Sequence, residues 1–242
     1  MPRQFWGYYD NGTYRVGCNG ATIWVYDQSA TLLRRFSDIS YVYCGTFRPG
    51  TNIFVAKSTG GLLAIYDFNS MKCIKKFRFG YDGVQDEGFA FSNEGQLFYN
   101  IQKQDSLHSE LAVYDGNDFC LLKRLFYEDE LLELTDIEVD ETSGKIIVLG
   151  FRRDPVYKVL THGFLAELCG DELKNAVNIS ESDYDYYLRC KTVERSGNTN
   201  KVMEQMNNPS LYSKPTKRIS LFEEYEKRVL TCSSFSMWKS GR

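Results

Sequence analysis

Acidic side chains are the first candidates for chemistry, because they gather in two stretches of the chain. The candidate binding residues in these stretches are Asp82, Asp86, Glu87, Glu128, Asp129 and Glu130. Grouped carboxylates can hold a cation or a basic partner, but these lack the alternating oxygen-ligand spacing of a calcium loop. The pattern therefore predicts an acidic binding patch, with solvated loop charge as the simpler alternative.

Catalytic and metal-binding patterns are weak. His108 lies beside Asp105 and Ser106, but side chains so close in sequence point in different directions, whereas a triad must converge in space. His162 has no Cys or His partner at metal-ligand spacing. Gly60-Gly61 has the character of a turn and does not form a phosphate-binding motif. We therefore predict no catalytic residue, no metal site and no cofactor.

Basic residues recur as adjacent pairs in three similar strands. The pairs are Arg34-Arg35, Lys75-Lys76 and Lys123-Arg124. Lysine or arginine on the outermost strand of a sheet hinders pairing with other chains. The alternative is functional: the pairs form a basic rim for an acidic partner.

Each basic pair follows an apolar strand that ends in Tyr-Asp. The three strands are Ile23–Asp27, Leu63–Asp67 and Leu111–Asp115, and their aspartates are 40 and then 48 residues apart. Tight turns divide each period into four short strands. Asn11-Gly12 and Asn19-Gly20 predict hairpins of type I′, which need a positive φ at both central residues.

Four strands in a period of 40–48 residues are typical of a β-propeller blade. Residues 3–168 resemble WD40-type repeats, with Tyr-Asp where that family has Trp-Asp. The Gly-His dipeptide of the family is absent, so the chain is WD40-like and divergent. The resemblance implies an all-β, β-propeller-like array of four-stranded antiparallel blades, three clear and one degenerate. Another antiparallel meander, such as a sandwich, is the alternative.

The resemblance divides the chain into WD40-like blades at 1–168 and an extension at 169–242, which would complete a blade or dock on the propeller. A helix is expected within 216–230, where Ser220 and Glu223 have the spacing of a capping box. Residues 1–188 carry a net charge of −9 and residues 189–242 a net charge of +6, which favours docking. Closed propellers usually have four to eight blades, whereas this chain has three clear blades and one degenerate blade. A second copy could supply the missing strands, so we also expect a homo-oligomer that forms through an open blade edge.

The composition favours a soluble protein of a reducing compartment. The 7 cysteines are dispersed, which argues against a disulfide framework. The N-terminus has no apolar signal region, and no apolar run approaches the length of a membrane span. We therefore expect a cytoplasmic protein with no membrane contact.

The function implied by the WD40 resemblance is a non-enzymatic protein–protein interaction scaffold whose partner the sequence does not identify. One alternative is a hydrolase or lyase that uses acidic residues on the propeller face. Another is nucleic-acid binding through the basic tail, which is less favoured because Glu223, Glu224 and Glu226 interrupt its positive charge. The repeat alignment also predicts that Trp24, Ile65 and Val113 are buried.

Overall fold

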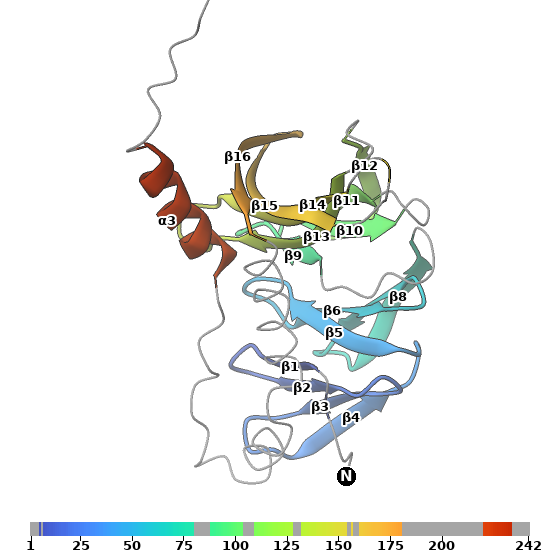
Figure 1. Cartoon of the computed structure of the whole chain (residues 1–242). Coiled ribbons are helices and arrows are strands. Elements are labelled where there is room, and N and C mark those ends of the chain that lie inside the picture. Colours follow the sequence, from blue (N-terminus) through green and yellow to red (C-terminus); the bar gives the residue numbers. More distant parts are fainter. Residues whose placement is uncertain are drawn as a thin grey trace, which may run out of the picture.

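The computed structural model describes residues 5, 7–79, 88–103, 109–127, 132–153, 156, 160–180 and 220–233. Sixteen strands form four sheets, each built from four strands that are consecutive in sequence and antiparallel. This arrangement confirms the predicted all-β class and the blade-like repeat. Figure 1 shows the sheets following one another in chain order, with a single described helix beside the last sheet.

The strand bounds show how regular the repeat is. Sheet 1 contains β1 (Gly7–Asp10), β2 (Arg15–Cys18), β3 (Ile23–Tyr26) and β4 (Leu32–Phe36). Sheet 2 contains β5 (Val42–Phe47), β6 (Ile53–Ser58), β7 (Leu62–Asp67) and β8 (Lys72–Arg78). Sheet 3 contains β9 (Phe89–Phe91), β10 (Leu97–Lys103), β11 (Ser109–Asp115) and β12 (Leu121–Leu125). Sheet 4 contains β13 (Leu132–Val139), β14 (Ile146–Arg153), β15 (Leu160–Cys169) and β16 (Glu172–Ile179).

The fourth sheet has as many strands as the others, although it lacks the Tyr-Asp signature. Its last strand, β16, pairs with β15 from Cys169↔Glu172 to Gly163↔Ile179. The predicted boundary at residue 168 therefore falls inside β15. The helix, α3 (Leu221–Ser233), begins later than the predicted 216. Among the described residues, no helix combines the length and apolar character that crossing a membrane requires.

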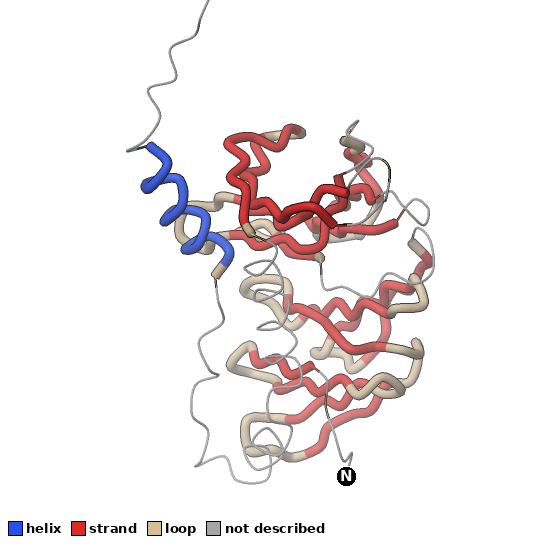
Figure 2. The backbone as a smooth tube through the Cα atoms, in the orientation of Figure 1, coloured by secondary structure: helices blue, strands red, loops and turns tan. Residues whose placement is uncertain are grey.

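Apolar layers between successive sheets form the core. One layer joins sheets 1 and 2 and includes Val16, Val25, Phe54, Tyr66 and Phe68. Similar layers join sheet 2 to sheet 3 and sheet 3 to sheet 4. Because neighbouring strand residues point to opposite faces, each internal sheet has one apolar face toward the preceding sheet and one toward the next. Figure 2 shows this succession of strand layers.

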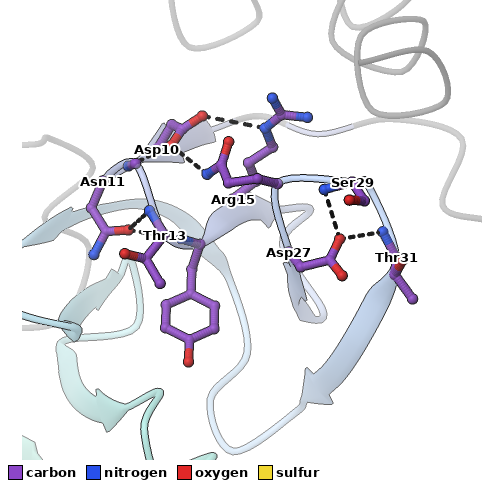
Figure 3. Close-up of polar contacts among 10 residues, drawn as sticks. Asp10, Asn11, Thr13, Arg15, Asp27, Ser29 and Thr31 are labelled. Carbon is purple, nitrogen blue, oxygen red and sulfur yellow. Dashed lines mark hydrogen bonds and ion pairs between the residues drawn. The ribbon is translucent and has the colours of Figure 1, made fainter.

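The Tyr-Asp motif has the same local role in each of its three copies. The tyrosine, Tyr26, Tyr66 or Tyr114, is buried, and the aspartate begins the turn to the last strand. Asp27 Oδ1 accepts hydrogen bonds from the backbone N–H groups of Ser29 at 2.9 Å and Thr31 at 2.8 Å (Figure 3). Side-chain acceptors of this kind replace a backbone partner and hold a tight turn.

Asp67 and Asp115 accept equivalent bonds. The donors to Asp67 Oδ1 and Asp115 Oδ1 are the N–H groups of Asn69, at 3.0 Å, and Asn117, at 2.7 Å. The repeated Asp therefore defines where the third strand ends and the fourth begins.

The Asn-Gly pairs form hairpins, but the predicted type I′ turn is wrong. Gly12 and Gly20 have φ values of 82° and 85°, whereas neither asparagine has a positive φ. Asn11 instead uses its side chain, because its Oδ1 accepts a hydrogen bond from the N–H group of Thr13 at 3.0 Å (Figure 3). It also accepts one from the N–H group of Tyr14 at 2.8 Å. Only the glycine then needs the left-handed conformation.

The predicted core residues divide into two groups. Ile65 and Val113 are buried, as expected. The prediction for Trp24 is wrong: it is only half-buried, because it points away from sheet 2, toward the face of sheet 1 that no described sheet covers. In the alignment of the Tyr-Asp repeats, Trp24 corresponds to Ala64 and Ala112, whereas Val25 corresponds to Ile65 and Val113.

Candidate interaction surface

The basic pairs lie on the fourth strand of each of the first three sheets. In every sheet this strand is terminal, with only the third strand as a hydrogen-bonded neighbour. First strands contact one another between sheets 1 and 2, where β1 contacts β5, and between sheets 3 and 4, where β9 contacts β13. The fourth strands are therefore the outer edges, and β4, β8 and β12 lie along the right-hand side of Figure 1.

An irregularity in strand pairing recurs on these outer strands. In each Tyr-Asp sheet the pairing of the last two strands shifts by one residue just before the tyrosine. The extra residues on the outer strands are Leu33, Ile74 and Leu122, which are 42%, 52% and 55% exposed. A bulge of this kind redirects the side chains next to it. Here it also gives three successive sheets an exposed apolar side chain at the same position.

The first basic residue of the second and third pairs binds the next sheet. Lys75 Nζ donates to the backbone carbonyls of Asp118 at 2.6 Å and Phe119 at 3.0 Å, in the last turn of sheet 3. Lys123 Nζ donates to a carboxylate oxygen of Asp171, in the last turn of sheet 4. The two lysines thus tie their sheet to the equivalent turn of its successor.

The second basic residue of each of these pairs points to the opposite face of its strand and has other partners. Lys76 Nζ donates to the carbonyl of Asp38, at 3.0 Å, in the connection between sheets 1 and 2. The Nη1 atom of Arg124 lies 3.4 Å from Oε1 of Glu110, a buried residue of the neighbouring strand β11 in the same sheet. Adjacent strand residues point to opposite faces, so Lys75 and Lys76 bind on both sides of sheet 2, whereas Arg124 binds within its own sheet. This role was not predicted from the sequence, although the two-residue period of a strand and the recurrence of the pairs could have indicated it.

The first basic pair differs from the other two. Arg34 and Arg35 are both exposed. The Cζ atom of Arg34 lies 5.7 Å from the ring centroid of Phe36, and that of Arg35 lies 5.0 Å from the ring centroid of Trp24. Neither guanidinium forms a hydrogen bond or ion pair within the described part of the chain. These two arginines keep their donors available.

The predicted acidic site residues lie in parts of the chain that the structure does not describe. Asp82, Asp86, Glu87, Glu128, Asp129 and Glu130 lie outside the described residues, as does His108. Two further carboxylates of the second acidic stretch, Glu133 and Asp136, are buried on β13 and do not extend an exposed patch. In the described ranges, no group of His, Cys, Asp and Glu side chains is arranged to hold a metal ion.

A buried polar group lies between sheets 2 and 3. Lys57 donates from Nζ to the carbonyl of Ile101 at 2.7 Å, and its ammonium group lies 5.1 Å from the ring centroid of Phe79. On the facing sheet, Gln102 donates to Glu110. Burial raises the pKa of the adjacent Tyr114 to about 12, with Arg124 opposing the shift, so its hydroxyl stays protonated at neutral pH. These side chains are enclosed by the sheets and strengthen one interface rather than offering an accessible reactive group.

The outer face of sheet 4 is covered by α3. Leu221 and Tyr225 are buried against Ile147, Leu149 and Leu165. Polar contacts fix the helix as well: Glu138 on β13 accepts a hydrogen bond from Ser220 Oγ at 2.6 Å and from the N–H of Leu221 at 2.9 Å. A carboxylate at this position satisfies a free N–H group and suits the positive end of the helix.

The opposite end of the array is built differently. Phe5 is buried against the outer face of sheet 1, and its ring makes an edge contact with Tyr26 at 6.5 Å. A Cβ on Gly17 would lie 2.4 Å from this ring, so the glycine makes room for Phe5. Trp24, stacked with Arg35, completes the face.

Comparison with known proteins gives no family for the chain. No family model matches the sequence, and no curated protein matches it significantly.

Proposed function

We propose that this chain is a protein–protein interaction scaffold built from divergent WD40-like blades. The observation that carries the proposal is the recurrence of an exposed apolar residue, Leu33, Ile74 or Leu122, on the outer strands of three successive sheets. Single exposed leucines are common on protein surfaces, but their repetition at one bulge position makes a row that a single partner could contact.

The basic residues add an electrostatic preference to the row. Arg34, Arg35, Lys76, Lys123 and Arg124 are exposed on the same three strands. An acidic partner would gain charge complementarity, which increases the association rate and selectivity more than it increases affinity. The rigid sheets behind the row would hold these side chains at fixed spacing, which suits a binding role.

Comparative affinity capture tests the proposal. The triple variant L33S/I74S/L122S removes the apolar row, whereas V156S is a matched control because Val156 is exposed and lies on none of these outer strands. We expect that proteins captured by the wild-type chain are lost with the triple variant and retained with V156S. Equal capture by all three proteins would contradict a role for the row, and the absence of any captured protein would contradict the scaffold proposal.

A further inference from the structure

The three basic pairs look equivalent in sequence but differ in what their charges are used for. Lys75, Lys76, Lys123 and Arg124 all contact neighbouring turns, connections or carboxylates. Arg34 and Arg35 have only ring contacts in the described structure. The position of sheet 1 in the array explains why Arg35 has no polar partner. No described sheet precedes sheet 1, so the side chain of Arg35 contacts Trp24 instead of a neighbouring sheet.

The residue type of the free pair is also informative. A guanidinium group has a planar set of donors that can bind a carboxylate with two parallel hydrogen bonds, and it remains well suited to this when stacked on an aromatic ring. The ring contacts of Arg34 with Phe36 and of Arg35 with Trp24 leave the edges of both guanidinium groups available. Both arginines are therefore prepared to bind anions.

The strand that carries the pair has an open edge. β4 hydrogen-bonds only to β3, so its other edge has no strand partner in the described sheets. Arg34 and Arg35 point to opposite faces of β4, and in an extended partner strand consecutive side chains also alternate between faces. A strand added along this edge could therefore place one of two adjacent carboxylates beside each arginine. Leu32 and Leu33, 43% and 42% exposed, precede the pair and could contact apolar side chains of the same segment.

We propose that β4 is a docking site for an extended acidic segment of a partner protein, which adds as a further strand and pairs two adjacent carboxylates with Arg34 and Arg35. This inference depends on the proposed scaffold function, and it names the partner's chemistry and its place of contact. Strand addition supplies affinity through backbone hydrogen bonds, while the side chains that flank the edge supply specificity. β8 and β12 do not offer the same site, because their basic side chains already bind neighbouring parts of the chain.

A random peptide library tests the inference, with the whole chain of 242 residues as bait. Each peptide has about ten residues, enough for an extended recognition segment. We expect enriched peptides to contain two adjacent acidic residues beside apolar ones. The variant R34A/R35A should bind the best peptide at least about tenfold more weakly, as expected for the loss of charge-assisted hydrogen bonds. R34K/R35K should recover only part of the affinity, because lysine keeps the charge but not the planar donors.

The matched control is K174A/K227A, which removes the same charge from two exposed surface pairs, with Glu172 and Glu224. It should bind the peptide like the wild type. Peptides that lack acidic residues, or that bind R34A/R35A as tightly as the wild type, would overturn the inference while leaving the scaffold proposal intact. If no peptide is enriched and affinity capture also yields no partner, the scaffold proposal itself fails. Tighter binding of a single-stranded oligothymidylate than of any peptide, lost in R34A/R35A, would assign the pair to nucleic acid instead.

Discussion

The two ends of the array show how the same kind of sheet face is completed in different ways. At sheet 4, α3 covers an aliphatic face and is fixed by the carboxylate of Glu138. At sheet 1, Phe5, Trp24 and Tyr26 cover the face with aromatic rings, and Arg35 stacks on the indole. The first end is a helix packed on a sheet, and the second leaves a half-buried aromatic and a free cation near the surface. Because the free cation lies at sheet 1, the proposed docking site is at this end of the array and not at sheet 4.

The position of Trp24 explains this contrast at the level of single residues. The corresponding residues in the internal sheets are Ala64 and Ala112, both fully buried where a preceding sheet packs closely. Ala166, which pairs with Val148 in sheet 4, is also fully buried. Small side chains allow the close approach of two sheets, whereas a tryptophan at the same position needs open space.

The largest effect should come from giving an internal sheet the residue of the end sheet. Ala112→Trp would force an indole between sheets 2 and 3, and we expect a loss of about 3 kcal/mol or more in the free energy of unfolding, or failure to fold. Chemical denaturation measures the change. A melting curve like that of the wild type would show that the alanine is not at a close-packed interface.

A smaller effect is expected from loosening the helix on sheet 4. Tyr225→Ala removes a buried ring, and we expect α3 to lose about 2–4 kcal/mol of docking free energy. Hydrogen exchange should then accelerate in β14 and β15 but not in sheet 1. Leu230→Ala is the control, because Leu230 is 68% exposed and its loss should leave exchange unchanged.

Trp24→Ala should destabilise the chain less than an equivalent loss in the core. The half-buried ring and its contact with Arg35 account for about 1–2 kcal/mol. Denaturation should show this modest loss, and peptide binding at β4 should also weaken because the stacking surface of Arg35 is gone. A loss as large as that of Ala112→Trp would mean that the face of sheet 1 is packed like an internal interface.

The smallest effect concerns the turns that all three Tyr-Asp sheets share. Hydrogen bonds from the N–H groups of Asn117 and Asp118 lower the pKa of Asp115 from its ordinary value of 3.8. A carboxyl whose pKa is lowered by folding stabilises the protein above its unfolded pKa, and this stabilisation is lost as the pH falls through the folded pKa. Below about pH 4 the melting temperature should therefore fall less in Asp115→Asn than in the wild type. Peptide binding should be nearly the same in both proteins. An identical acid dependence in both proteins would contradict this role.

The sequence predicted the repeat well because its signals are local. Alternating apolar residues, Asp67 and Asp115 at turns, and glycines such as Gly12 define strands and their ends without reference to distant parts of the chain. Ser220 similarly begins α3, where its Oγ accepts a hydrogen bond from the N–H of Glu223 at 3.2 Å. These features follow from backbone geometry and neighbouring side chains.

The long-range features could not be read in the same way. Lys75 and Lys123 resemble Arg34 in sequence, yet their bonds depend on where the next sheet places its last turn. The bulge at Leu33 cannot be predicted from the apolar–polar pattern, because it changes the register between β3 and β4 and not the composition of either strand. The prediction for Trp24 was wrong for the same reason, because the burial of this side chain depends on whether another sheet precedes sheet 1. The predicted acidic patch and the predicted homo-oligomer both remain predictions.

Hydrogen exchange of the chain with and without its best-binding acidic peptide tests the central claim most directly. The account predicts slower exchange in β4, where a new strand would pair with the open edge, and little change in α3 and β16. It also predicts that this protection disappears in R34A/R35A and persists in K174A/K227A. Protection confined to sheet 4 and α3, or unchanged exchange in β4 under saturating peptide, would contradict the docking site.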